Sequence, residues 1–315
     1  MTTGGVVTLT MNPALDLSTD VDVVVPFLKL RCGAMRRDPG GGGINVARVV
    51  TRLGGRARAV LPVGGCVGQL LLQLVAAEGV DNVPLAIAGE TREDFTVFER
   101  KSGNQFRFVE PGPKLAQGEW EALLDAFAAE TKDAAYAVIS GSLPPGVPVE
   151  FFAMAAERMK ALGIPLALDT TGAGLHAALA HGVALVKPNK REFEELAGLE
   201  APRPEQLAAA ARELVAQRNA GAVALTLAED GAILATRDAA WRAKAPEVKA
   251  VSTVGAGDSF LGAMIWSLTE GHDWPEAFRL GVAAGTAALL SPGTDLAHPD
   301  QVRTLVQQVV IEKIA

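Results

Sequence analysis

Cysteine and aromatic side chains are scarce in this sequence of 315 residues. Cys32 and Cys66 are the only cysteines, and they form no CxxC pair and have no histidine nearby. This pattern excludes a disulfide framework and a cysteine zinc site. Only 5% of the residues are aromatic while 49% are hydrophobic, so the core has to be built mainly from Ala, Val and Leu. The four histidines show neither metal-ligand nor triad spacing.

The sequence also lacks a positive net charge and long apolar runs. The formal net charge is −7, which argues against nucleic acid or an anionic membrane as the main partner. No apolar run is long enough to span a bilayer, and residues 1–5 contain no basic leader-like segment. We therefore expect a cytoplasmic protein whose few basic clusters meet a small anionic substrate.

Short apolar strands alternate with amphipathic helices over most of the chain. The alternation is clear where a predicted strand at 137–140 is followed by a helix at 151–162 and a further strand at 166–169. Another such helix is predicted at 205–217. Such alternation predicts a mostly parallel sheet that helices cover on both faces.

Two segments, 16–38 and 91–110, break this rhythm. The first places Val21, Val23 and Val25 in strand-like alternation, and the second is typical of a β-hairpin. We expect the two segments to pair with each other as a small separate sheet, which would serve as a lid over the site.

The stretch STVGAGDS at 252–259 is the strongest functional signal. Gly255, Ala256 and Gly257 leave backbone N–H groups uncovered at the start of an apolar helix, and this predicts an anion cradle. Asp258 would repel a bound anion, but it suits a base that takes a proton from a hydroxyl attacking a phosphoryl group. The alternative is a glycine-rich turn with Asp258 as an ordinary N-cap.

A second glycine run, Gly40–Gly43, leads directly into an apolar helix that we expect over residues 44–53. Four consecutive glycines cost conformational entropy, which indicates that something approaches the backbone closely. A flexible linker is the alternative. Asn45, near the helix start, can either cap the helix or bind sugar hydroxyls.

The segment KPNKRE at 187–192 follows a predicted strand, at the edge where open parallel sheets bind ligands. Asn189 and Glu192 lie three residues apart and so face the same side of a first helical turn. Such a pair can hold the waters of a magnesium ion that bridges phosphates, or it can form a capping box. The sequence leaves both readings open.

Four basic residues stand out in the two lid segments: Lys29, Arg31, Arg92 and Arg107. In an acidic protein they suggest capture of a phosphate on the substrate, although each can also be a solvated strand charge. Asp16, directly after the turn NPAL, can accept hydrogen bonds from sugar hydroxyls or simply stabilise the turn.

Together these motifs resemble the ribokinase-like, phosphofructokinase-B family of sugar kinases, over essentially the whole chain. The matching motifs are the glycine run before Asn45, SGSLP at 140–144, NKRE at 189–192, Thr226-Leu227 with Gly231, and TVGAGD at 253–258. The resemblance implies a three-layer α/β/α sandwich with a mostly parallel central sheet and a small β-sheet lid. The implied core comprises residues 1–15, 43–90 and 111–315, and the implied lid comprises residues 16–42 and 91–110.

Within the family, NPALD at 12–16 marks phosphosugar kinases, while residues 29–32 and 39–48 look most like the ATP-dependent 6-phosphofructokinase branch. Fructose-1-phosphate and tagatose-6-phosphate kinases usually carry a lysine where this chain has Gly42. The resemblance therefore implies phosphorylation of C1 of fructose 6-phosphate, giving fructose 1,6-bisphosphate. A tagatose-6-phosphate or fructose-1-phosphate kinase is the alternative, and a non-catalytic sugar-phosphate sensor is a third.

The resemblance also implies the roles of single residues. Asp258 is the base for the C1 hydroxyl, and the amides of Gly255, Ala256 and Gly257 form the anion hole. The residues implied to hold fructose 6-phosphate are Asp16, Lys29, Arg31, Gly41, Gly42, Asn45, Arg92, Arg107, Ser140 and Ser142. Those implied to line the ATP site are Lys187, Asn189, Thr226, Ala228 and Gly231, with Glu192 organising Mg²⁺. The implied ligands of a potassium ion beside the anion hole are Ser252, Val254, Ala288, Ser291, Gly293 and Asp295.

Two positions depart from the family pattern. Ala228 stands where many relatives have the first glycine of a nucleotide loop, and Asp295 replaces a basic residue. The family further implies a homodimer that forms through the lid.

Overall fold

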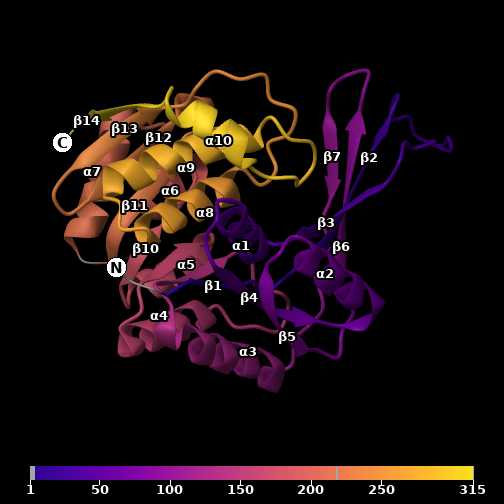
Figure 1. Cartoon of the computed structure of the whole chain (residues 1–315), viewed down its shortest axis with the longest axis horizontal. Coiled ribbons are helices and arrows are strands. Elements are labelled where there is room, and N and C mark those ends of the chain that lie inside the picture. Colours follow the sequence, from indigo (N-terminus) through magenta and orange to yellow (C-terminus); the bar gives the residue numbers. More distant parts are fainter. Residues whose placement is uncertain (1–3, 218, 315) are drawn as a thin grey trace.

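A ten-stranded sheet runs through the centre of the computed structural model, which describes residues 4–217 and 219–314 (Figure 1). Its strands are β1 (Val6–Leu9), β4 (Ala57–Val63), β5 (Asp81–Ala86), β8 (Tyr136–Ser140), β9 (Leu166–Asp169), β10 (Val183–Val186), β11 (Ala220–Thr226), β12 (Ala232–Thr236), β13 (Ala240–Lys244) and β14 (Val310–Lys313). A separate four-stranded sheet consists of β2 (Ala14–Val21), β3 (Arg36–Gly40), β6 (Arg92–Glu99) and β7 (Gln105–Phe108).

The helices pack on both faces of the central sheet. They are α1 (Gly42–Arg52), α2 (Gly65–Ala77), α3 (Gln117–Glu130), α4 (Phe151–Leu162), α5 (Gly172–Leu179), α6 (Lys190–Ala197), α7 (Pro204–Ala216), α8 (Ala256–Thr269), α9 (Trp274–Ala288) and α10 (Pro299–Val306), with 3₁₀ turns η1 (Thr131–Asp133) and η2 (Ala228–Asp230). None of these helices, within the described residues, is long and apolar enough to cross a membrane. The predicted α/β/α sandwich is confirmed.

The central sheet has the strand order β14-β13-β12-β11-β10-β9-β8-β1-β4-β5. All neighbours from β5 to β11 are parallel, and β12, β13 and β14 continue the sheet in antiparallel fashion. The connections from β1 lead first to β4 and β5 on one side, and the chain then returns to β8 on the other. The carboxyl ends of β1 and β8 therefore meet at a topological switch point.

Two hydrophobic cores lie on the two faces of the sheet. One includes buried side chains of α1, α2, α8, α9 and α10, and the other those of α3 to α7. Both consist mainly of Ala, Val and Leu, as the composition predicts. Small residues let helices approach closely, since a Cβ at Gly262 of α8 would lie 2.9 Å from Cβ of Val49 in α1.

The expected small separate sheet is present and stands to one side of the core (Figure 1). Strand β2 pairs with β6 in parallel register from Ala14 to Val21, and β3 and β7 flank this pair in antiparallel fashion. The prediction that strand alternation continues past Val21 is wrong, because residues 22–35 contain no strand. Pro26 in this segment has no N–H to donate to a ladder, which disfavours a strand there.

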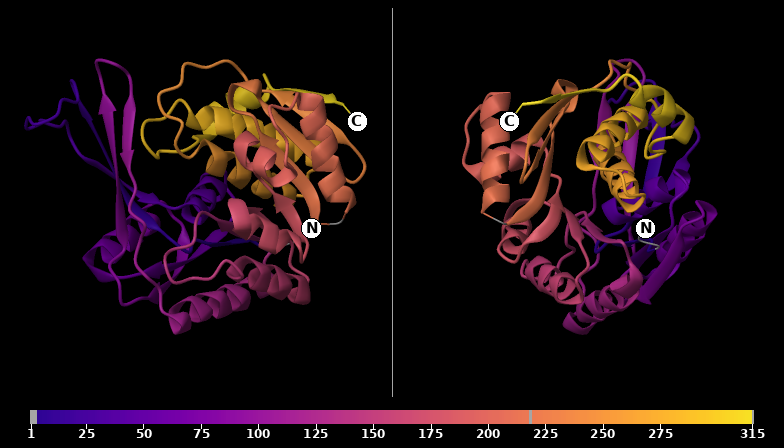
Figure 2. Two further views of the ribbon diagram at one scale, coloured as in Figure 1. Left: turned by 180° about the vertical axis from the view of Figure 1, so that it is seen from behind. Right: turned by 60° about the vertical axis from the view of Figure 1, so that its left-hand side comes forward.

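The described chain begins and ends on the side of the molecule away from the small sheet. Figures 1 and 2 show both ends beside the central sheet, with the small sheet at the opposite end in each of the two matching views. The small sheet joins the core through four chain crossings, since each of its two segments leaves the core and returns to it.

Candidate active site

The carboxyl edge of the parallel strands carries polar residues that the sequence separates widely. Ser140 is the last residue of β8, Asp169 of β9 and Thr226 of β11. Lys187 follows β10 at the same edge. Ser140 and Lys187 both contact Asp169, at 3.3 Å and 3.2 Å, beside the switch point between β1 and β8, where a parallel sheet opens a crevice for ligands.

The glycine run crosses this crevice in close contact with the strand ends. A Cβ at Gly42 would lie 2.2 Å from Oγ of Ser140, and one at Gly41 would lie 2.6 Å from Cγ2 of Thr10. Side chains at these positions would therefore clash. The run ends β3 and begins α1, so it is a packed element of the site and not a flexible linker.

Asp258 lies in the first turn of α8 and contacts side chains from two other elements. Its Oδ2 accepts a hydrogen bond from Nδ2 of Asn45 at 2.9 Å, and its Oδ1 accepts one from Oγ of Ser140 at 3.5 Å. Burial and the charge of Asp169 raise the pKa of Asp258 to about 6, although Asn45 and Lys187 act in the opposite direction. A carboxyl group with this pKa is well suited to accept a proton near neutral pH.

Lys187 brings a positive charge to the same place. Its side chain is only 6% exposed, and its Nζ lies 3.2 Å from Oδ1 of Asp169. Burial alone would lower the pKa of the ammonium, but Asp169 and Asp258 outweigh that effect and raise it, so Lys187 stays charged. A Cβ at Gly257 would lie 3.2 Å from this Nζ, which places the ammonium against the start of α8.

The start of α8 has the features of an anion cradle. Gly255 is the N-cap residue with φ of 76°, a conformation that glycine adopts without strain, and no side chain caps the helix. The first N–H groups of a helix have no acceptor within the helix, and they point toward the positive end of its dipole. Since Gly255 and not Asp258 is the N-cap, the reading of Asp258 as an ordinary N-cap is wrong.

Asp16 on β2 lies among charges from neighbouring strands of the small sheet. Burial and Asp94 raise the pKa of Asp16 to about 7, while Arg107 and Arg92 lower it. Arg92 is fixed in place, because its guanidinium donates to the carbonyl of Asn12 at 3.0 Å and lies 3.2 Å from the Asp94 carboxylate. The small sheet thus brings carboxylates, which accept hydrogen bonds, close to the guanidinium groups of Arg92 and Arg107.

An open hollow of about 570 Å³ adjoins these residues. Arg92 and Ser142 both line it, together with Asn12 and Glu110. The two residues expected to hold one sugar phosphate, Arg92 from the small sheet and Ser142 from the core, therefore face a common space.

The predicted nucleotide residues also lie together. Asn189 and Thr226 form a β-bridge between the start of α6 and the end of β11. Asn189 and Glu192 form the capping box that the sequence allowed, with Oδ1 and Oε2 accepting backbone N–H groups at 2.9 Å. The second carboxylate oxygen of Glu192, Oε1, takes no part in this capping box, so capping and magnesium binding are compatible. No cluster of three or more His, Cys, Asp or Glu within the described residues is arranged to hold a metal.

The loop after β11 has a strained alanine. Ala228 adopts φ of 52°, in the left-handed region that L-residues avoid, and it is the position where the family pattern has glycine. Gly231 closes the loop with φ of 91°, and a Cβ there would lie 2.0 Å from the carbonyl oxygen of Ala243.

The segments predicted to bind potassium are adjacent. Ser252 donates from Oγ to the carbonyl of Gly293 at 3.1 Å, and Ser291 donates its N–H to Ala288 at 3.1 Å. Oγ1 of Thr294 is buried without a hydrogen-bond partner, so an unused oxygen faces the interior of this loop. Buried carbonyl and hydroxyl oxygens are the donors that a hard cation requires, so these residues fit a potassium ion.

Asp295 does not fit that site through its side chain. Its carboxylate lies 3.3 Å from Arg36, 3.5 Å from Arg52 and 3.4 Å from His298, and its carbonyl accepts from Arg52. Burial alone would raise the pKa of Asp295, but Arg36 and His298 lower it overall. The side chain thus connects β3 of the small sheet to the core.

Lys29 and Arg31 are not brought into contact with this site. Both lie in the exposed segment 22–35, which projects from the molecule beside the small sheet (Figures 1 and 2), and neither forms an ion pair with any described residue. Two other residues of the site were not predicted. Asp169 had a readable signal, as a carboxylate ending an apolar strand at the ligand edge. Arg48 had none.

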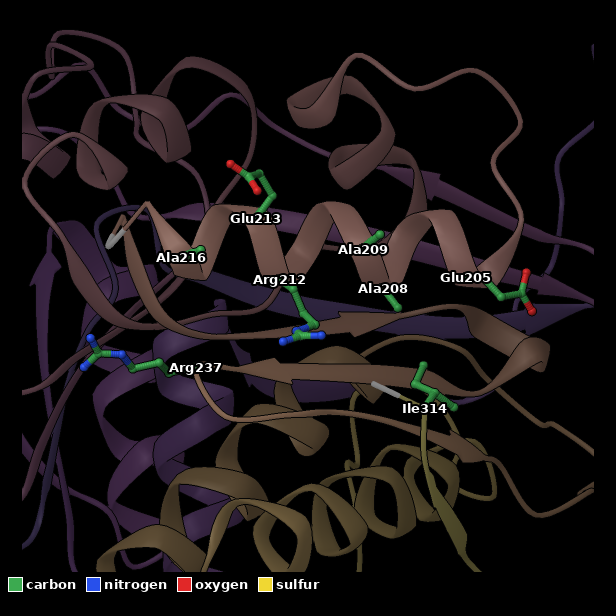
Figure 3. Close-up of a pocket in the computed structure, with 8 residues that line it drawn as sticks. All are labelled: Glu205, Ala208, Ala209, Arg212, Glu213, Ala216, Arg237 and Ile314. Carbon is green, nitrogen blue, oxygen red and sulfur yellow. The ribbon is translucent and has the colours of Figure 1, made fainter.

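A second hollow, of about 510 Å³, lies elsewhere. It is lined by Glu205, Ala208, Ala209, Arg212, Glu213 and Ala216 of α7 together with Arg237 and Ile314 (Figure 3). It contains no predicted site residue, so we do not assign it to the active site.

An aspartate with a raised pKa beside an uncapped helix start, on an α/β/α sandwich with a separate small sheet, is the arrangement expected of a sugar-kinase-like enzyme. The chain belongs to the pfkB family of carbohydrate kinases, whose model matches residues 9–301.

The chain is similar in sequence or structure to three known proteins of related function. It is 47% identical to the ATP-dependent 6-phosphofructokinase isozyme 2 of Mycobacterium tuberculosis, over 94% of this chain and 87% of that protein. It is 30% identical to the 1-phosphofructokinase of Bacillus subtilis, over 98% and 99%. The solved phosphofructokinase-2 of Escherichia coli in complex with substrates and products is 40% identical, with a TM-score of 0.93 over 96% of this chain and 99% of that one. The same Escherichia coli protein has been solved in complex with potassium, with a TM-score of 0.92 over 97% and 99%.

Proposed function

We propose that this protein is an ATP-dependent 6-phosphofructokinase that phosphorylates C1 of fructose 6-phosphate. The observation that carries the proposal is Asp258, held by Asn45 and Ser140 beside the uncapped start of α8, with a pKa of about 6. The higher identity to a 6-phosphofructokinase than to a 1-phosphofructokinase supports fructose 6-phosphate over the alternative substrates.

In the proposed reaction the carboxylate of Asp258 accepts the proton of the C1 hydroxyl. The C1 oxygen forms a bond to the γ-phosphorus as the bond from that phosphorus to the bridging oxygen breaks, and ADP leaves with the electron pair. The amides of Gly255, Ala256 and Gly257 stabilise the charge on the transferring group, and the nearby ammonium of Lys187 adds to this stabilisation.

The sugar phosphate would lie between the small sheet and the core. Asp16, Gly41, Gly42 and Asn45 are proposed to position the sugar, with Arg92 and Ser142 on its phosphate. Arg107 is exposed but close enough to affect the pKa of Asp16, so it adds positive potential at the same end. ATP would lie along Asn189, Thr226 and the loop to Gly231.

Two cations belong to the proposal. Mg²⁺ would arrive on the ATP phosphates and neutralise part of their charge, with Asn189 and Glu192 contacting its waters. The unpartnered Oγ1 of Thr294 and the adjacency of Ser252 and Gly293 support a potassium ion beside the anion cradle. A potassium complex of the Escherichia coli protein is consistent with that site.

We further propose a homodimer formed through the small sheet, where Phe108 is 60% exposed. Because the reaction consumes ATP, we propose the cytoplasm as its compartment.

Replacement of Asp258 with Asn tests the role of the base. We expect turnover to fall by about a hundredfold or more, because the amide cannot accept the proton, while ATP and fructose 6-phosphate still bind. Steady-state kinetics and calorimetric binding measure the two effects. Asp238→Asn, an exposed change of the same kind, is the control. Near-normal turnover in Asp258→Asn would refute the assignment.

A panel of phosphorylated sugars tests the substrate. We expect kcat/KM with ATP, Mg²⁺ and K⁺ to be highest for fructose 6-phosphate, followed by tagatose 6-phosphate, which differs at one carbon. A higher value for fructose 1-phosphate would reassign the enzyme to the alternative. ADP formation that does not depend on any sugar phosphate would contradict both readings.

A further inference from the structure

Arg48, on α1, is a fully buried cation with an exposed fraction of 0%. Burying a guanidinium is costly, and its surroundings lower its pKa mainly through loss of water, against the charge of Glu78. A helix of this kind could place an aliphatic side chain there instead. The contacts of Arg48 show what the charge does.

The guanidinium joins four separate parts of the chain. Nη2 donates to the Glu78 carboxylate at 2.9 Å, which compensates the buried charge. Nη1 lies 3.0 Å from the carbonyl of Pro39, 3.0 Å from that of Thr294 and 3.2 Å from Oδ1 of Asn45. The last contact lies directly behind the catalytic base.

The Asn45 amide has one accepting end and one donating end, and its neighbours on the two sides demand opposite ends. Arg48 can only donate, so it requires Oδ1. The ionised Asp258 can only accept, so it requires Nδ2, which lies 2.9 Å from its Oδ2. A reversed amide would place oxygen against carboxylate and N–H against guanidinium, and both contacts would be repulsive.

We propose that Arg48 is a positioning residue for the base: it fixes the orientation of the Asn45 amide, which then holds the Asp258 carboxylate in its ionised form. The proposal rests on the proposed role of Asp258 and deepens it. The other charged groups that affect Asp258 are Asp169 and Lys187, which Arg48 does not contact. Loss of Arg48 frees the amide to turn and removes a hydrogen bond that favours the carboxylate.

The test compares Arg48→Met with Arg52→Met across pH. Arg52 lies one turn further along α1 and binds the same Glu78, at 2.8 Å, but it does not touch Asn45. For Arg48→Met we expect kcat to fall by about ten- to a hundredfold and the acid limb of the kcat profile to move up by about half to one pH unit. The KM for ATP stays within about threefold, because none of the four residues that the Arg48 guanidinium contacts is a proposed nucleotide residue. In Arg52→Met the limb stays in place.

Three further measurements separate positioning from folding. If Arg48→Met fails to fold, Arg48→Lys keeps the charge but cannot span the same acceptors, and we expect the same direction of shift. Adding Arg48→Lys to Asn45→Ala should change kcat by less than about twofold, since the route through Asn45 is already lost. Carbon-13 NMR of the Asp258 carboxyl follows its titration without any substrate, and its midpoint should move up in the variant.

The outcomes are distinct. An unshifted acid limb and NMR midpoint in Arg48→Met and Arg48→Lys, or full additivity with Asn45→Ala, would overturn the positioning role. Failure of the proposed function would instead appear in the unaltered protein, as a lack of fructose 6-phosphate turnover.

Discussion

Two aspartates near the switch point hold protons more tightly than a solvated aspartate does. Burial is the main cause for both, and it raises the pKa of Asp16 to about 7 and that of Asp258 to about 6. A base must nevertheless be ionised to act, and Asn45 supplies the hydrogen bond that favours ionisation at Asp258. The site therefore keeps a carboxylate that is basic enough to accept a proton and still largely ionised at neutral pH.

The pH dependence of turnover follows from this balance. Only the ionised form of Asp258 is active, so activity is present above its pKa and is lost as the pH falls through about 6. We expect log kcat/KM for fructose 6-phosphate to decline toward a slope of one below that midpoint, measured at saturating ATP between pH 5 and 9. Asp16→Asn is the control, and the limb should persist in it if Asp258 is the titrating group. A flat profile down to pH 5 would contradict the assigned base.

At the residue scale, the sequence predicted those parts of the site whose residues are adjacent in the chain. Gly255 to Asp258 could be read as cradle and base because their chemistry depends on the first turn of one helix. Arg48 could not be found in this way, because as a sequence feature it is one charge on a helix. Its burial depends on Glu78, after α2, and on Thr294, and only the folded structure brings these together.

Among the elements, the loop between β11 and β12 combines a strained alanine with a required glycine. Ala228 has φ of 52° and Gly231 has φ of 91°. An alanine in the left-handed region costs about 1 kcal/mol, part of which a glycine would recover despite its greater freedom in the unfolded chain.

We therefore expect Ala228→Gly to raise the free energy of unfolding by about 0.5 to 1 kcal/mol. Urea unfolding followed by circular dichroism measures the change. Gly231→Ala in the same loop is the opposite case, since its Cβ would lie 2.0 Å from the carbonyl oxygen of Ala243, and it should destabilise the protein. A loss of stability in Ala228→Gly would show that the alanine is not strained.

Element boundaries were predictable where local signals and tertiary packing agree. The helix over 151–162 was expected and is found with the same bounds, because Gly163 after it adopts the left-handed conformation that ends helices. The strand expected around Val23 and Val25 is absent, because alternation alone does not supply a pairing partner. The partner strand β6 ends at Glu99, opposite Val21, and the chain then enters a turn.

In the whole molecule, exposed apolar side chains lie on β7 of the small sheet, directly after it, and in the segment 22–35 beside it. The exposed fractions are 103% for Phe27, 69% for Leu28, 60% for Phe108 and 58% for Val109. Exposed apolar side chains are typical of a contact with another protein, and the proposed partner is a second copy of the chain.

Phe108→Lys tests the proposed dimer. We expect the mass in solution to fall from that of two chains to that of one, because a charge at the contact cannot be desolvated cheaply. Light scattering coupled to size-exclusion chromatography measures it. Val310→Lys on β14, where the valine is 61% exposed and lies in the central sheet, is the matched control. A dimer that survives Phe108→Lys while Val310→Lys dissociates would place the contact on the other sheet.

The positions of the chain ends bear on how the enzyme can be handled. The described chain begins and ends on the side away from the small sheet (Figures 1 and 2), whereas the proposed base, cradle and contact surface depend on the carboxyl edge and the small sheet. A fluorescent protein or a surface anchor fused at either end would therefore leave the crevice open. The molecule can be immobilised by its ends for single-molecule measurements of turnover without blocking substrate entry or pairing.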